Sequence, residues 1–169
     1  MSFDLCLPII LASEGGFVDN PKDPGGATNL GITLNALSDW YGHPAAIDDV
    51  RGLTVDDVAP LYQVKYWNAA HCDDCAQGLD LMVFDEAVNQ GVGRAIKTLQ
   101  SAVGVADDGV YGPATLAAIK ACNPADAINA MAAAREAFYR GLSTFPTFGK
   151  GWLARLQRTQ GLALGMLSG

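Results

Sequence analysis

The chain has 169 residues, half of them apolar, and a formal net charge of −7 at pH 7. Such a chain is able to bury a sizeable core, which argues against disorder and indicates one compact domain or a main lobe with a smaller one. Because nucleic-acid affinity comes largely from lysine and arginine, the acidic balance argues against a nucleic-acid partner.

The first elements in chain order are a helix and a turn-rich segment. Apolar residues recur at helical spacing through residues 3–11 and predict a helix that stops at Glu14-Gly15-Gly16. Residues 17–33 contain two prolines, several glycines and several Asp or Asn residues, which forbid a continuous helix. We expect a hairpin or a small sheet there.

Helices account for most of the remaining chain. Thr33 is placed to cap a helix that Gly42 ends, and Thr54 with Asp57 three residues later is typical of a capped helix start. Further helices are expected at residues 79–90, 94–103, 113–122, 124–142 and 151–164. The sequence therefore predicts a mainly α fold with a small irregular or β hairpin element after the first helix.

The cysteines and the first residues bear on cofactors and location. Cys72 and Cys75 form a C-x-x-C beside His71, but no further ligands follow at zinc-site spacing, so we expect no metal and no cofactor. The first residues lack the basic start and cleavage site of a secretory signal, and the apolar stretch 5–12 is too short to span a membrane. We expect synthesis in the cytoplasm.

Glu14 is the leading candidate for acid chemistry. It follows the end of a predicted helix, where the helix dipole disfavours negative charge, and its neighbours are apolar residues or glycines. Both effects favour the protonated carboxyl group, and a protonated acid is what a glycosidase needs to protonate a leaving oxygen. The alternative is a solvated glutamate at a helix end.

Polar side chains follow in the turn-rich segment. Asp19, Asp23, Thr28 and Asn29 lie close after Glu14, and a hairpin folding back would bring one of them opposite the acid. Asp and Asn also favour turns for their own backbone reasons, which is the preferred interpretation of Asp19. For Asp23 the catalytic and the turn-forming interpretations stay open.

These residues belong to an ordered series of short motifs. Glu14-Gly15-Gly16-Phe17 is followed by Asn20-Pro21, Asp23-Pro24-Gly25-Gly26 and Thr28-Asn29-Leu30-Gly31-Ile32-Thr33. Later blocks are Tyr66-Trp67, Cys72-Asp73, Phe84-Asp85, Leu99-Gln100, Asp108-Gly109, Gly112-Pro113 and Gly151-Trp152. The series resembles glycoside hydrolase family 108, lysozyme-like N-acetylmuramidases of phages and prophages, and its C-terminal half resembles that family's predicted peptidoglycan-binding region.

The resemblance implies a substrate and a catalytic acid. It implies hydrolysis of the β-1,4 bond between N-acetylmuramic acid and N-acetylglucosamine in peptidoglycan, with Glu14 as the acid. Asp23 keeps the spacing of nine residues that phage lysozymes use for a second carboxylate. Thr28 or Asn29 stands near the place of their third residue, out of register, so both are expected to bind substrate or position water.

The resemblance also implies an organisation and a biological role. Residues 1–90 would form the catalytic region and residues 91–169 the peptidoglycan-binding region, packed into one compact unit. We expect a monomeric endolysin that reaches the cell wall after another protein releases it. A lytic transglycosylase using the same glutamate, and a non-catalytic peptidoglycan-binding module, are the alternatives.

A second polar pair lies in the middle of the chain. Asp85 and Asn89 are four residues apart on a predicted helix and therefore share a face. They would bind the acetamido or hydroxyl groups of a sugar, or else cap backbone inside the fold. Tyr41, Tyr62 and Tyr66 are expected in the core, because each lies on the apolar face of its helix.

Overall fold

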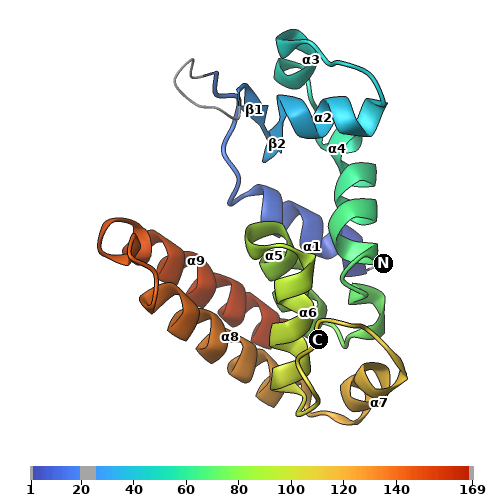
Figure 1. Cartoon of the computed structure of the whole chain (residues 1–169), viewed down its shortest axis with the longest axis vertical. Helices are drawn as coiled ribbons and strands as arrows, with labels where there is room; N and C mark the ends of the chain where they lie inside the picture. The colour runs from blue at the N-terminus through green and yellow to red at the C-terminus, as the bar shows by residue number, and fades with distance from the viewer. Residues whose placement is uncertain (1, 20–25, 168–169) are drawn as a thin grey trace. The chain divides into compact units, whose positions relative to one another are not determined.

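Figure 1 shows a chain made mostly of helices with one short hairpin, which confirms the fold class expected from the sequence. The computed structural model describes residues 2–19 and 26–167. The chain divides into two compact units, unit 1 over Phe3–Lys65 and unit 2 over Tyr66–Gly169.

Unit 1 holds the hairpin and short helices. Its elements are α1 (Ser2–Leu11), β1 (Thr28–Asn29), β2 (Ile32–Thr33), α2 (Leu34–Tyr41), α3 (Ile47–Arg51) and α4 (Val55–Tyr62). The two strands pair antiparallel, and the hairpin packs against α2 and α3. The five-residue helix α3 was not predicted, because it is too short to show a helical repeat.

The predicted helix starts of unit 1 are confirmed by their caps. Thr33 Oγ1 accepts a hydrogen bond from the Ala36 amide at 3.1 Å, and Gly42 ends α2 with a left-handed φ of 73°. Thr54 and Asp57 bond each other's backbone reciprocally at the start of α4. Local side-chain chemistry therefore sets where these helices begin.

Unit 2 is built from longer helices. Its elements are η2 (Cys72–Asp74), α5 (Leu79–Gln90), α6 (Val92–Ala102), α7 (Pro113–Ala121), α8 (Pro124–Arg140) and α9 (Phe145–Met166), and a π-helix, η1 (Gln63–Asn68), crosses from unit 1. Figure 1 shows α8 and α9 side by side, in orange and red. Helix α9 starts six residues before the predicted Gly151, since Pro146 is tolerated in its first turn.

Helix α5 is the core helix of unit 2. Every residue from Leu79 to Ala87 is buried, and α6, α8 and α9 all pack against it. The buried stretch includes three acidic residues: Asp80, Asp85 and Glu86. A helix buried on all sides must pair its charged groups internally, which makes its partners central to the fold. In the part of the chain that the structure describes, no helix is both long and apolar enough to span a membrane.

Candidate active site

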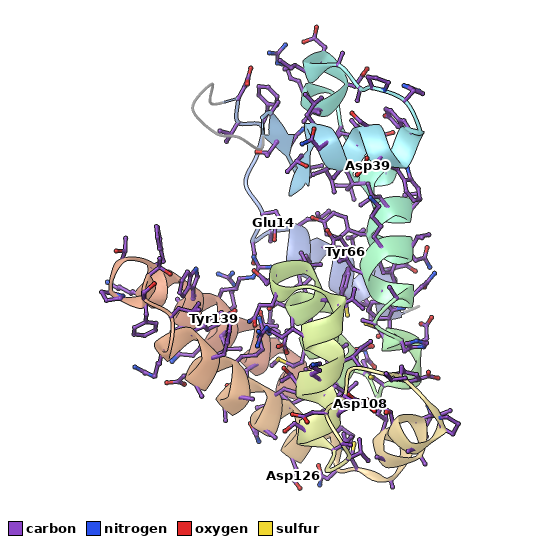
Figure 2. The ribbon with its side chains drawn as sticks, viewed as in Figure 1. Glu14, Asp39, Tyr66, Asp108, Asp126 and Tyr139 are labelled. Atoms are coloured by element: carbon purple, nitrogen blue, oxygen red, sulfur yellow. The ribbon has the colours of Figure 1, made fainter. Side chains whose placement is uncertain are left out.

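Glu14 stands just beyond the end of α1, as Figure 2 shows. The chain turns tightly there, because the amides of Ser13 and Glu14 bond the carbonyls of Ile10 and Leu11 at 2.9 and 3.1 Å. These bonds use carbonyl groups that the helix end would otherwise leave unsatisfied. The Glu14 side chain is half-buried, so its carboxyl group is partly shielded from water yet open to a ligand.

The hairpin turn between β1 and β2 lies against Glu14. Leu30 and Gly31 form this turn with φ values of 49° and 74°, the two positive values of a type I′ turn. A left-handed conformation is uncommon for a bulky residue such as Leu30 and carries strain of about 1–3 kcal/mol. The Tyr62 hydroxyl from α4 donates a 2.9 Å hydrogen bond to the Leu30 carbonyl and so helps hold the turn.

Gly31 permits a close approach between this turn and the acid. A Cβ atom at residue 31 would overlap the Tyr62 hydroxyl oxygen and stand 3.1 Å from both Cγ and Oε2 of Glu14. Ordinary van der Waals contact begins beyond that distance. The absence of a side chain at Gly31 therefore lets the turn, Glu14 and Tyr62 share one small space.

Backbone hydrogen bonds tie the segment after Glu14 to the same hairpin. The Leu30 amide donates to the Gly15 carbonyl at 3.2 Å, and Val18 and Thr28 exchange two bonds of 2.8 Å. Asp23 lies outside the described residues. Val18 and Thr28, which flank its segment in the sequence, are joined in a β-bridge.

The other polar candidates of unit 1 have different surroundings. The Asn29 side chain is buried, and its amide nitrogen donates to the carbonyls of Val50, Arg51 and Leu53 at 3.1–3.4 Å. Asn29 therefore satisfies carbonyl groups at and just after the C-terminal end of α3. Contact between Asn29 and a sugar stays a prediction. Thr28 is half-buried in β1, and Asp19 is exposed.

The second polar pair does not act as a pair. Asp85 is 1% exposed, and its two carboxylate oxygens bond Arg135 at 2.7 Å and Arg155 at 3.0–3.1 Å. Asn89 is exposed, and its amide nitrogen bonds the Asp85 carbonyl at 2.8 Å. Asp85 thus joins α5 to α8 and α9, whereas Asn89 lines a cavity of about 290 Å³ in unit 2.

Glu86 has an unusual electrostatic environment. Burial raises its pKa to about 7, against the opposing influence of Arg135 and of the Thr98 hydroxyl. Thr98 donates to Glu86 Oε1 at 2.7 Å, and Arg135 Nε lies 4.0 Å from Oε2. The carboxyl group therefore changes protonation near neutral pH.

Two of these features were missed at the level of sequence. Tyr62 is buried as expected, but its hydroxyl contact with the hairpin links residues 32 positions apart and leaves no local pattern. The role of Gly31 is hidden for the same reason. The expectation that Tyr41 lies in the core is wrong, since it is 43% exposed near the end of a two-turn helix.

The cysteines are free thiols. Burial raises the pKa of Cys75 to about 12. Across residues 2–19 and 26–167, no three metal-binding side chains gather at one place.

Comparison with known proteins identifies the family. Residues 7–91 match the family model described as Glycosyl hydrolase 108, and residues 94–157 match one described as Predicted Peptidoglycan domain. The solved structure of SagA from Brucella abortus is 44% identical, with a TM-score of 0.86 over 98% of this chain and 95% of that chain. No curated protein matches the chain significantly. The chain belongs to glycoside hydrolase family 108 and is a glycoside hydrolase that acts on peptidoglycan.

Proposed function

We propose that this enzyme is an N-acetylmuramidase that hydrolyses the β-1,4 bond between N-acetylmuramic acid and N-acetylglucosamine. The observation that carries the proposal is the packing of the Glu14 carboxyl group against the Leu30–Gly31 turn. This packing fixes an acid beside a rigid backbone feature at the end of α1. A glycosidase needs its acid held in this way, because proton transfer depends on precise placement.

Glu14 acts as the proton donor in this mechanism. It protonates the glycosidic oxygen as the bond to the anomeric carbon breaks, so that the leaving sugar departs as a neutral alcohol. A water molecule then supplies the hydroxyl group at the anomeric carbon. Tyr62 holds the neighbouring turn through Leu30 and acts as a positioning residue.

Asp23 is the proposed second catalytic group. A carboxylate about 6.5–9.5 Å from the acid would activate water directly and invert the anomeric centre, whereas a separation of about 5–5.5 Å would favour a covalent intermediate and retention. The spacing of nine residues after Glu14 supports the choice of Asp23. Replacement of Asp23 by Asn is expected to abolish activity in either mechanism.

The decisive variant is Glu14→Gln, which removes the transferable proton and keeps the size of the side chain. Release of reducing sugar from purified peptidoglycan should fall by about 100-fold or more, because general acid catalysis contributes on the order of 10²–10⁴. Glu136→Gln changes a more exposed glutamate on α8 and should keep full activity. Full activity in a folded Glu14→Gln protein would overturn the assignment.

Product analysis tests the type of reaction. Hydrolysis creates one reducing N-acetylmuramic acid end per cleavage, and mass spectrometry of the released fragments should show it. Fragments ending in anhydro-muramic acid would identify a lytic transglycosylase instead. The third alternative, a non-catalytic module, is not supported, because the chain belongs to a glycoside hydrolase family.

The proposal also assigns separate functions to the two halves of the chain and a biological role to the whole protein. Residues 1–90 would carry catalysis and residues 91–169 would bind the wall, in a monomer that acts as an endolysin after release from the cytoplasm. The family matches support this division, since the two matched regions meet between residues 91 and 94. Expression inside a Gram-negative cell should cause lysis only when a membrane-permeabilising protein is co-expressed.

A further inference from the structure

A cavity of about 560 Å³ lies within unit 2, between α5, α6 and α8. Its volume falls in the range of typical small-ligand sites, which is about 300–1,000 Å³. Both signs of charge line it. The cations are Arg94, Lys97 and Arg135, and the acids are Glu86 and Asp107.

Several buried polar atoms in this lining lack a hydrogen-bond partner. Among the described residues, Glu86 Oε2, Arg135 Nε and Nη1, and both amide atoms of Gln90 are buried without a hydrogen bond. Buried polar groups are nearly always hydrogen-bonded, because an unsatisfied one destabilises the fold. A ligand with several donors and acceptors would satisfy these atoms. Glu86 and Arg135 are each only 1% exposed, so they form a fixed floor to the cavity.

The charges exclude a simple anion as the best ligand. A phosphate or sulfate would meet the three cations but also face Asp107 and, in the fraction of molecules in which it is ionised, Glu86. A group that carries a carboxylate and an ammonium together would complement both sets, because charge-assisted hydrogen bonds are the strong ones. The lining therefore fits the zwitterionic end of an amino acid.

A second cavity adjoins the first and has a different character. It shares Gln90, Arg94 and Phe138 with the charged cavity and is otherwise lined mainly by aromatic and aliphatic side chains, among them Trp152 and Tyr139, whose rings lie 5.4 Å apart. Figure 2 labels Tyr139 on α8. The Arg94 guanidinium stacks on the Phe138 ring at 4.0 Å where the cavities meet. A ligand with a charged end and a less polar body would span both.

We propose that this charged cavity binds the peptide stem of peptidoglycan through an amino acid that bears both a carboxylate and an ammonium group. The carboxylate lies on Arg94 and Lys97, and the ammonium faces Glu86 and Asp107. The inference rests on the proposed function, because it takes peptidoglycan as the substrate. It adds that the enzyme recognises the peptide as well as the sugar chain.

The test uses the full chain carrying Glu14→Gln and the tripeptide L-alanyl-γ-D-glutamyl-diaminopimelate, whose last residue has both charges. Calorimetric titration should show binding, and Lys97→Met should weaken it by about 10-fold or more, since a charged hydrogen bond contributes about 1.5–3 kcal/mol. Lys97 is exposed, and methionine keeps its aliphatic stem, so the variant should fold. Lys150→Met, an exposed lysine of α9 outside the cavity lining, should bind as the parent does.

Modified ligands decide the chemistry. Acetylation of the free amine of the diaminopimelate residue or amidation of the carboxylates of that residue should each weaken binding. Equal binding of all three peptides, no tripeptide binding, or displacement by inorganic phosphate at similar concentration would each overturn the inference.

A separate assay isolates the proposed function. Compared with the wild type, the Lys97→Met enzyme with Glu14 intact should lose a larger fraction of its rate on intact peptidoglycan than of its rate on peptide-free glycan strands. Equal fractional losses on the two substrates would overturn the inference alone. Failure of the wild-type enzyme to cleave either substrate would overturn the muramidase proposal, while the tripeptide titration would still decide the cavity's ligand.

Discussion

At Gly31 the backbone of the hairpin turn lies directly against the side chains of Glu14 and Tyr62. Replacement by alanine adds a Cβ that must displace the Tyr62 hydroxyl and press on the Glu14 carboxyl group. We expect Gly31→Ala to lower peptidoglycan hydrolysis by about 100-fold, because displacement of a catalytic group by about 1 Å costs that much. Circular dichroism would establish that the variant is folded.

Gly42 provides a matched control for this prediction. Its φ of 73° almost equals the 74° of Gly31, but a Cβ there would meet nothing within 4 Å. Gly42→Ala should therefore show only the cost of a left-handed alanine, about 1–2 kcal/mol of stability, and keep its activity. Equal activity losses in the two variants would show that backbone strain, rather than the Glu14 contact, is responsible.

Glu86 should make stability depend on pH. Its pKa rises from 4.5 in the unfolded chain to about 7 in the folded one, so the folded state holds a proton that the unfolded state releases between these values. The free energy of unfolding should therefore fall as pH rises from about 4.5 to about 7, by at most about 3 kcal/mol from this group. Urea unfolding at several pH values measures it.

Glu86→Gln tests the origin of that slope. The amide cannot ionise, yet it retains an oxygen that can accept the hydrogen bond from Thr98. The decline in stability across this pH window should become shallower in Glu86→Gln and stay unchanged in Glu136→Gln, whose carboxylate is exposed on α8. A decline of equal size in Glu86→Gln and the wild type would contradict the assignment to Glu86.

At the scale of single elements, helix caps differ in a way that mutation can measure. Asn123 caps α8 by accepting bonds from the Ala125 and Asp126 amides at 2.9 and 3.3 Å. Thr144 holds the same position before α9 but makes no side-chain cap bond. Asn123→Ala should therefore cost about 1 kcal/mol of unfolding free energy, and Thr144→Ala close to none. Equal losses in chemical denaturation would contradict this difference.

The elements also show how far local sequence signals reach. Helices α2 and α5 begin and end where caps and glycines predicted, and α4 begins where its cap predicted, because those signals act within four residues. The π-helical turn of η1 was missed, since no local pattern marks it. The start of α9 at Phe145 was also missed, since the helix was expected only from Gly151.

The candidate site was only partly predictable for a related reason. Glu14 was singled out by its place after a helix and by the motif around it. Its contacts with the turn at Gly31 and with Tyr62 depend on tertiary packing, which the linear pattern does not contain. The partners of Asp85 lie 50 and 70 positions away on α8 and α9, so its buried role was equally hidden.

At the scale of the whole molecule, the net charge of −7 sets the salt dependence of wall binding. An acidic enzyme and an anionic wall repel each other at long range, and salt screens that repulsion, with a Debye length of about 10 Å at 0.1 M. Contacts with the buried Glu86 and Arg135 of the charged cavity are screened less than contacts with exposed charges. Binding of the Glu14→Gln protein to insoluble peptidoglycan should therefore hold steady or strengthen as salt rises from about 0.02 to 0.2 M.

Lys150→Glu separates the long-range electrostatic repulsion between enzyme and wall from the local contacts in the cavity. The exchange removes one positive charge and adds one negative charge, so the net charge changes from −7 to −9 away from the cavity lining. In co-sedimentation, this variant should bind the wall more weakly than its parent at low salt and equally at high salt, because only the repulsion has changed. A steep loss of wall binding with salt in the parent would instead mean that long-range attraction by a local cationic surface dominates recognition.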